Sequence, residues 1–304
     1  MRRFGIDIGG HTITAAEVDF TGSIPAVIAP ETIETPETRD LSDVIGAVGA
    51  LVSKRVHESE ECFVGLCIPG FLDRDRRHIV RLTNFKNCDG AEGAQLMERF
   101  FAAHGIAAHC AMENDANCAA LGEEIAGAAR GMTDFAVITL GTGIGSGIVT
   151  GGRLLTGAHG FAAEFGHIAL KGDHTLCHCG CQGMGHLEEI ASADNIENSA
   201  RALGLPGDFR KLWDMRFDDE RAYGIIIKAS DALARGIASL ASLFDPEAVI
   251  LSGGMSRADG LVDEISKLTV KYLPFMYVSV LDIVKSELGS SAAVIGAASL
   301  LRNR

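Results

Sequence analysis

The fold of this chain is indicated most clearly by its opening stretch, FGIDIGGHTITAAEVDF at residues 4–20. Its first residues are predicted to form a short buried strand, the two adjacent glycines a tight turn, and the remaining residues a second strand. The same succession returns in FAVITLGTGIGSGIV at residues 135–149, although the two stretches differ in sequence. This repeat predicts two lobes of similar topology that face a cleft, with the chain crossing between them near residues 116–133.

The rest of the chain alternates between short apolar runs of strand length and longer runs with apolar residues at helical spacing. Expected strands lie at residues 62–68, 106–112 and 248–251, and expected helices at residues 41–56, 94–103, 114–126, 187–203, 222–244, 262–272 and 292–301. Alternation of this kind in two successive series predicts an α/β fold. We expect a small lobe at residues 1–117, completed by residues 292–304, and a large lobe at residues 118–291.

The composition excludes several classes of function. Of the 304 residues, 47% are hydrophobic, which is enough for a large buried core. The 27 basic and 40 acidic residues give a net charge of −13, which argues against a basic surface that binds nucleic acid or anionic lipid. No apolar run has the length of a membrane span, and no secretion signal follows Met1. We therefore expect a cytoplasmic protein without a nucleic-acid or membrane partner.

The stretch CHCGCQGMGHLE at residues 177–188 places three cysteines at alternate positions and ends with His186 and Glu188. Glu164 and His167 precede it closely. Thiolate and imidazole groups at this spacing are typical of a four-coordinate zinc site, whereas a set of reduced surface thiols is the alternative. A metal here would order the glycine-rich loop and aim the two carboxylates at a ligand. The other five cysteines are scattered singly and are predicted to be small core residues: Cys62, Cys67, Cys88, Cys110 and Cys118.

Three glycine turns follow predicted strands and suit the binding of a nucleotide. Asp7 precedes Gly9-Gly10, where backbone N–H groups can approach phosphate oxygens and the carboxylate can hold Mg²⁺ through water; an ordinary hairpin is the alternative. The turn LGTGIGSG at residues 140–147 leads into a strand rather than a helix, which argues against a dinucleotide site. The third turn, ILSGGM at residues 250–255, either permits close approach of a flat base or is a loop without a ligand.

The segment MENDAN at residues 112–117 lies where a predicted strand gives way to a helix. Asn114 or Asp115 could cap this helix, but a cap accounts for one polar side chain and not for the whole set. A carboxylate at a strand end that faces a cleft can instead orient a hydroxyl group and accept its proton, as in kinase chemistry. We favour this catalytic role for Asp115.

Together these segments resemble the ROK family (repressor, open reading frame, kinase), the bacterial sugar kinases of the actin-like ATPase superfamily. The resemblance spans nearly the whole chain and includes residues 157–167. It implies two ribonuclease-H-like lobes with ATP, Mg²⁺ and a sugar in the cleft, and a general base at Asp115. By the same resemblance, the sugar-binding residues are Asn114, Asp115, Glu164, His167 and Glu188, and the ATP-binding residues are Asp7, Gly9, Gly10, His11, Thr12, Gly141, Thr142, Gly143, Gly253 and Gly254, with Asp7 near Mg²⁺.

The chain departs from the family pattern at two of these turns. The family usually has Thr directly after the first glycine pair, whereas this chain has His11 and then Thr12. The hydroxyl contact to phosphate is therefore expected to shift or to be lost. The glycine that usually precedes the sugar-binding Glu164 is Ala163 here, which should tighten that turn and affect the choice of substrate.

The zinc loop also departs from the family pattern, Cys-x-Cys-Gly-x-x-Gly-Cys-x-Glu, and can be aligned with it in two ways. The family implies that His167 is one ligand of a structural Zn²⁺. An alignment without a gap makes Cys179, Cys181 and His186 the other three, with His186 in place of a cysteine. An alignment that starts at Cys177 uses Cys177 and Cys179 and then needs an insertion. We prefer the first and keep Cys177 as the alternative ligand.

The resemblance implies an ATP-dependent hexose kinase, with conversion of glucose to glucose 6-phosphate as the best single prediction. Kinases for mannose, fructose, allose or N-acetylmannosamine share this scaffold and are alternatives, as is a catalytically silent sugar-sensing protein. Regulators in the family carry a helix-turn-helix segment before the first glycine turn; because that turn starts at Asp7 here, we expect no such segment. We expect the partner to be a small-molecule sugar and the assembly to be a homodimer or a higher homo-oligomer.

Overall fold

The computed structural model describes the chain except for residues 58–59, 83, 171–175, 178–180, 182 and 304. The backbone forms two compact units. Unit 1 consists of Met1–Gly131, Leu154–Ala162 and Ser290–Arg304, and unit 2 consists of Met132–Arg153 and Ala163–Gly289. After its first residues in unit 2, the chain therefore returns to unit 1 for the short segment Leu154–Ala162.

Unit 1 is built on a five-stranded sheet that contains the first predicted strand pair. Its strand order is β3-β2-β1-β4-β7, with β1 antiparallel to β2 and parallel to β4. Successive side chains of a strand point to opposite faces, so Phe4, Ile6 and Ile8 of β1 enter one core with the buried residues of α1 and α2. The elements are β1 (Arg2–Ile8), β2 (Thr12–Asp19), β3 (Ala26–Glu34), β4 (Glu61–Ile68), β7 (Ala107–Asn114), α1 (Leu41–Ser53) and α2 (Gly93–Ala103).

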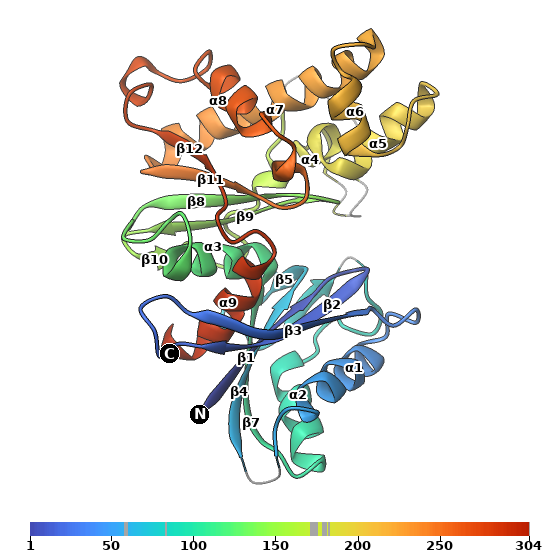
Figure 1. Ribbon diagram of the computed structural model, residues 1–304, viewed down its shortest axis with the longest axis vertical. Coiled ribbons are helices and arrows are strands. Elements are labelled where there is room, and N and C mark those ends of the chain that lie inside the picture. The colour runs from blue at the N-terminus through green and yellow to red at the C-terminus, as the bar shows by residue number, and fades with distance from the viewer. Residues whose placement is uncertain (58–59, 83, 171–175, 178–180, 182, 304) are drawn as a thin grey trace. The chain divides into compact units, whose positions relative to one another are not determined.

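The opposite face of this sheet is covered by α3 (Asp115–Ala126) and α9 (Ser291–Ser299), which come from distant parts of the chain (Figure 1). Glycines let the two helices approach closely: a Cβ on Gly296 of α9 would lie 1.8 Å from the carbonyl oxygen of Cys118 in α3. Because α3 packs on α9 in this way, the chain as far as Gly131 belongs to unit 1. This boundary differs from the one expected after residue 117.

A small hairpin, β5 (Gly70–Leu72) and β6 (Ile79–Leu82), follows directly after β4. The segment Leu154–Ala162 reaches it within unit 1, because Phe161 contacts Phe71 edge to face with ring centroids 5.8 Å apart. The hairpin and this returning segment are therefore neighbours, although they are far apart in sequence.

Unit 2 repeats the topology of unit 1. The strand order of its sheet is β10-β9-β8-β11-β12, with β8 antiparallel to β9 and parallel to β11. In both sheets the first strand is central, with its hairpin partner on one side and a parallel strand on the other. The predicted repeat is thus confirmed. The strands are β8 (Phe135–Leu140), β9 (Ile144–Thr150), β10 (Arg153–Leu154), β11 (Ala248–Ser252) and β12 (Asp282–Lys285).

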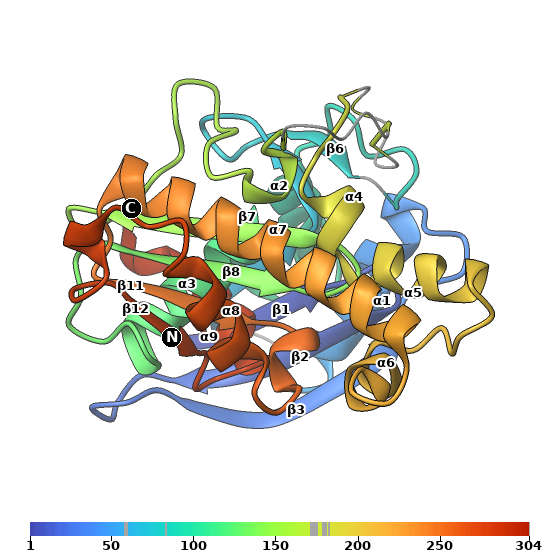
Figure 2. The ribbon, with the colours of Figure 1, turned by 90° about the horizontal axis from the view of Figure 1, so that it is seen from above.

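The helices of unit 2 gather around α7 (Glu220–Phe244), against which α4, α5, α6 and α8 all pack (Figure 2). The prediction of a single helix at residues 187–203 is wrong, because two helices, α4 and α5, occupy this stretch. The chain is extended at Ser192, whose hydroxyl accepts a hydrogen bond from the N–H of Asn195 at 3.4 Å and so starts a new helix. The bounds of the four packing helices are α4 (Glu188–Ala191), α5 (Ala193–Ala202), α6 (Phe209–Met215) and α8 (Leu261–Thr269).

The edge strands β3, β10 and β12 were not predicted from the sequence. In β3 most residues are exposed or half-buried, and Pro30 interrupts the pattern. Pro is tolerated at an edge because an edge strand pairs on one side only. Without a buried face these strands lack the apolar alternation that identifies a strand.

The buried core contains the cysteines that were predicted to be core residues. The five singly placed cysteines are all buried, as predicted: Cys62, Cys67, Cys88, Cys110 and Cys118. Aliphatic side chains make up most of both cores, and each core also contains phenylalanines, with Phe4 fully buried in unit 1 and Phe135 in unit 2. Among the described residues, no helix is both long and apolar enough to cross a membrane.

Candidate active site

The first glycine turn joins β1 to β2 in unit 1 and is held by a neighbouring threonine. The N–H of Gly9 donates to the carbonyl of Thr12 at 2.8 Å, which closes the turn. Thr35, just after β3, donates its hydroxyl to the carbonyl of Gly9 at 2.7 Å and its N–H to the carbonyl of His11 at 2.9 Å. His11 and Thr12 themselves are exposed. The turn is therefore a fixed, open surface at the end of the strand that carries Asp7.

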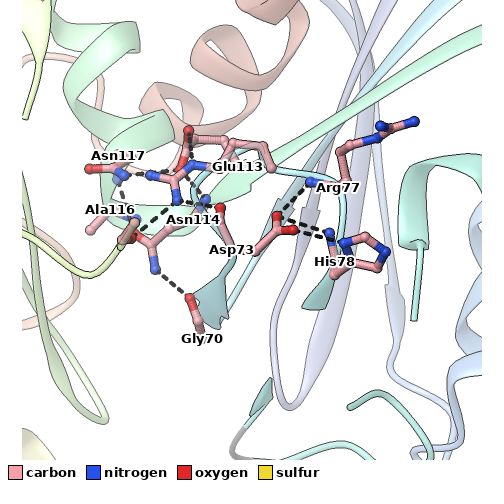
Figure 3. Close-up of polar contacts among 10 residues, drawn as sticks. Gly70, Asp73, Arg77, His78, Glu113, Asn114, Ala116 and Asn117 are labelled. Carbon is pink, nitrogen blue, oxygen red and sulfur yellow. Dashed lines mark hydrogen bonds and ion pairs between the residues drawn. The ribbon is translucent and has the colours of Figure 1, made fainter. Parts of the chain in front are cut away.

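Asn114 and Asp115 lie where β7 gives way to α3, also in unit 1. The side-chain oxygen of Asn114 accepts from the N–H groups of Ala116 at 2.9 Å and Asn117 at 3.2 Å, so Asn114 is the helix cap. Its amide group donates to the carbonyl of Gly70 at 3.1 Å, which ties the cap to the β5–β6 hairpin (Figure 3). Since Asn114 performs the capping, Asp115 is available for another role at the start of the helix.

The carboxyl groups of Asp7 and Asp115 in unit 1 both have raised pKa values. Burial raises the pKa of Asp115 to about 6, although a hydrogen bond from the N–H of Ala116 opposes this rise. Burial and the negative charge of Asp115 raise the pKa of Asp7 to about 7. Like charges that are partly removed from water disfavour joint ionisation. The two groups are therefore suited to hold a proton or to face a cation, and a base with a pKa near 6 is ionised at neutral pH.

In unit 2, the turn between β8 and β9 is joined to Glu188. The N–H of Gly141 donates to the carbonyl of Gly143 at 3.0 Å. The side chain of Glu188 accepts from the N–H of Ile144 at 2.7 Å, and a Cβ on Gly143 would lie 2.6 Å from the same carboxylate oxygen. Gly143 is thus required for close packing of this carboxylate. A residue predicted to bind sugar therefore also fixes a turn predicted to bind phosphate.

The third glycine turn follows β11 and lies beside the second. Gly253 has a φ of +88°, and a Cβ there would lie 2.3 Å from the carbonyl oxygen of Leu140. Both turns thus follow the carboxyl ends of two adjacent parallel strands, β8 and β11, where ligands of α/β sheets usually bind. Thr142 is exposed within the second turn, and Gly254 begins the short helix Met255–Arg257 after the third.

The short helix Phe165–His167 in unit 2 places Glu164 and His167 side by side. Nε2 of His167 lies 3.9 Å from a carboxylate oxygen of Glu164, and Nδ1 lies 3.1 Å from Nδ1 of His186. Ala163 before them has a φ of +65°, a left-handed conformation that disfavours any side chain. The residue usual in the family, glycine, would relieve this strain.

Four possible metal ligands meet in unit 2: His167, Cys177, Cys181 and His186, whose ligand atoms all lie within 4.8 Å of one another. Backbone hydrogen bonds support them, because the N–H of Leu187 donates to the carbonyl of Ile168 at 2.9 Å. Two imidazoles and two thiols at such separations fit a tetrahedral zinc ion. The group includes Cys177, which was predicted as the alternative ligand, whereas Cys179, which was predicted as the preferred ligand, lies outside the described residues.

Comparison with known proteins identifies the family of this chain. The ROK family profile matches residues 3–304. The chain belongs to the ROK family. This ROK protein is 32% identical to the glucokinase of Thermotoga maritima over 321 aligned positions, which cover 100% of this chain and 98% of that protein. It is 29% identical to the N-acetylmannosamine kinase of Haemophilus influenzae, over 98% of this chain and 94% of that protein.

A solved structure confirms the fold predicted for this ROK protein. The crystal structure of a ROK family glucokinase from Streptomyces griseus, in complex with glucose and AMPPNP, matches with a TM-score of 0.83 and 30% identity. The match covers 100% of both chains. The fold is therefore that of the actin-like ATPases, and the ROK protein is an ATP-dependent sugar kinase.

Arg76 is a charged residue of this ROK protein whose position beside the candidate site was not predicted from the sequence. It lies in the run DRDRRH at residues 73–78, which has the composition of a solvated turn. In the structure, however, its guanidinium group is paired with Glu113, next to Asn114 and Asp115. A charge run of this kind contains no signal that separates Arg76, whose side chain is 14% exposed, from its exposed neighbours.

Proposed function

We propose that this protein phosphorylates glucose with MgATP to give glucose 6-phosphate and ADP. The observation that carries the proposal is Asp115, a carboxylate with a raised pKa at the first turn of α3, in a chain similar throughout its length to glucokinases. Asn114 beside it is fixed by bonds to α3 and to Gly70 and is proposed to orient the sugar.

The proposed reaction is an in-line transfer of the γ-phosphoryl group. The hydroxyl oxygen on C6 of glucose attacks the γ-phosphorus, the bond from this phosphorus to the bridging oxygen breaks, and ADP leaves. Asp115 accepts the hydroxyl proton as the new oxygen–phosphorus bond forms. A base with a pKa of about 6 is ionised before the reaction at neutral pH and still has enough basicity to take the proton.

The phosphate groups are proposed to bind the glycine turns. Gly9, Gly10 and the turn from Gly141 to Gly143 present backbone N–H groups without a side chain that would keep phosphate away. Asp7 would hold Mg²⁺ through water, and the ion when bound neutralises charge on the phosphate oxygens. Gly253 and Gly254 would lie against the adenosine.

Glu164, His167 and Glu188 are proposed to bind the sugar hydroxyls from unit 2. Nδ1 of His167 faces His186 and Nε2 faces Glu164, so a zinc ion held through Nδ1 would leave Nε2 for a sugar hydroxyl. We propose His167, Cys177, Cys181 and His186 as the zinc ligands, because their ligand atoms lie together. Zinc when bound takes no part in the reaction and fixes the loop before Glu188.

The proposals for the location and the assembly of the protein rest on its buried cysteines and on its exposed apolar side chains. We propose a cytoplasmic enzyme, because buried cysteines without disulfides such as Cys62 and Cys110 suit a reducing compartment. A homo-oligomer is supported by exposed apolar side chains of unit 2, including Leu243 and Phe275, which are 76% and 86% exposed.

A coupled assay of ADP formation with glucose, mannose, fructose, allose and N-acetylmannosamine tests the substrate. We expect the highest kcat/KM with glucose, and the product should be a substrate for glucose 6-phosphate dehydrogenase. The relative in Haemophilus influenzae makes N-acetylmannosamine the second candidate. If none of these sugars stimulates ADP formation, the proposal that the protein phosphorylates a sugar is refuted.

A further inference from the structure

A buried ion pair lies beside the Asn114–Asp115 turn and has no part in the reaction steps above. Glu113, at 5% exposure, accepts from Nε of Arg76 at 2.8 Å through one carboxylate oxygen. Its other oxygen accepts from the N–H of Asn114 at 2.9 Å and from the side-chain amide of Asn117 at 3.0 Å (Figure 3). The carboxylate therefore holds both asparagines of the turn and is itself held by the arginine.

Arg76 extends this contact to two further segments of unit 1. Its Nη1 donates to the carbonyl oxygens of Asp73 and Gly160, each at 3.1 Å. One guanidinium group thus joins the end of β7, the turn of the β5–β6 hairpin and the returning segment Leu154–Ala162. A planar group with several donors in fixed directions is suited to such a junction.

The backbone conformation at Arg76 and at Gly160 allows the guanidinium group to make these contacts. Arg76 has a φ of +55°, which is unfavourable for a residue with a side chain. Its turn is clamped by the carboxylate of Asp73, which accepts from the N–H groups of Arg77 at 2.7 Å and His78 at 3.0 Å. At the other end, a Cβ on Gly160 would lie 2.9 Å from Nη1 of Arg76. Strain at one residue and a glycine at the other both serve the approach of this guanidinium group.

We propose that Arg76 is a positioning residue for the acceptor sugar. It would hold Asn114 and Asp115 in a fixed arrangement with the hairpin and with the segment Leu154–Ala162, which leads directly to Glu164. The contact of Phe71 with Phe161 and the bond from Asn114 to Gly70 join the same segments. The inference rests on the proposed function, because it concerns the acceptor part of that site.

The competing explanation is that Arg76 only neutralises Glu113. Arg76→Met leaves a buried carboxylate without its countercharge, which destabilises a fold strongly. Adding Glu113→Gln removes that charge, and the amide oxygen of the new side chain can still accept from the N–H of Asn114. The double variant therefore restores the electrostatic balance of the turn but lacks the bonds from Arg76 to Asp73 and Gly160.

The test compares wild type, Arg76→Met, Arg76→Met with Glu113→Gln, and Arg77→Met as the matched control with an exposed side chain. Arg76→Met should lower Tm and raise the KM for glucose at least about tenfold, since small misplacements of a bound substrate are costly. The double variant should regain most of the lost Tm while its KM for glucose stays raised about tenfold. The KM for ATP should change less than about twofold throughout.

Return of both Tm and glucose KM to wild-type values in the double variant would overturn the proposal, because Arg76 would then be a counter-ion only. An unchanged KM in Arg76→Met would do the same. If Arg76→Met is unfolded, the double variant carries the test alone; a double variant that is also unfolded assigns Arg76 to folding and rejects the positioning role. Wild-type protein without turnover on glucose would instead refute the proposed function.

Discussion

Replacement of Asp115 by asparagine should remove most of the turnover and stabilise the fold at the same time. The side chain keeps its shape, and its oxygen can still accept from the N–H of Ala116, which donates to Asp115 at 2.8 Å. Loss of a general base typically lowers kcat by about 10²–10⁴-fold. The ionised carboxylate, however, destabilises the folded state, since burial raises its pKa from 3.8 to about 6.

The size of the gain in stability follows from this pKa. One pKa unit is worth about 1.4 kcal/mol, so the ionised Asp115 costs the folded state at most about 3 kcal/mol. Asp115 as a whole residue is half-buried, so solvent screens part of this cost, and we expect a gain of about 1–2 kcal/mol in the asparagine variant. Removal of this charge also removes one cause of the raised pKa of Asp7. The ionised Asp7 then costs the folded state less, which adds to the gain in stability.

The sign of the pH dependence is fixed by the same values. The folded state binds the proton of Asp115 more tightly than the unfolded state, so the contribution of Asp115 to wild-type stability is greatest below pH about 4 and declines as pH rises through about 6. The asparagine variant lacks this decline. Its advantage in free energy of unfolding should therefore be small near pH about 4 and complete above pH about 7.

Urea unfolding at both pH values, together with kcat at neutral pH, measures the two effects. Asp75→Asn is the control, because that carboxylate is exposed. Turnover within about tenfold of wild type would refute the assignment of Asp115 as the base. A variant that is no more stable than wild type above neutral pH would refute the argument from the raised pKa. The wild-type activity itself should decline as pH falls through about 6, where Asp115 takes up its proton.

Three further outcomes are expected in unit 2. Removal of zinc by a chelator should raise the KM for glucose and lower Tm together, whereas cobalt in its place should leave kcat within about twofold, because the ion takes no part in the reaction. Metal analysis should show that His186→Ala and Cys177→Ser both lose zinc; retention of zinc by Cys177→Ser would favour Cys179 as the ligand. Gly143→Ala should lower kcat at least about tenfold by displacing Glu188, which a new Cβ would approach to 2.6 Å, whereas Gly46→Ala, with nothing within 4 Å, should not.

The parts of the fold and site that could be predicted from sequence are those encoded within short stretches. The strand–glycine–strand pattern specified both hairpins, β1–β2 and β8–β9, because each is complete within about twenty residues. The junction of β7 and α3 is likewise encoded by residues 112–117. The alternation of cysteines and histidines after His167 predicted a metal site, and four possible ligands do lie together there.

The parts that could not be predicted depend on contacts between distant residues. Unit 1 extends to Gly131 and does not end after residue 117, because glycines of α3 and α9 let these helices pack closely. Nothing in the sequence of either helix alone indicates its partner. Ser192 has ordinary helical neighbours on both sides, and only the extended backbone there reveals a cap.

Arg76 is the clearest case, and it shows why a positioning residue is harder to predict than a catalytic one. Asp115 could be proposed as the base from sequence, because a general base of this kind is a carboxylate at a strand end and local sequence expresses that requirement. The role proposed for Arg76 requires a reach of 37 positions to Glu113 and 84 positions to Gly160. Its neighbours Arg74 and Arg77 are the same residue type and are exposed. What distinguishes Arg76 is a left-handed backbone and a buried partner, and both exist only once the hairpin, β7 and the returning segment have folded together.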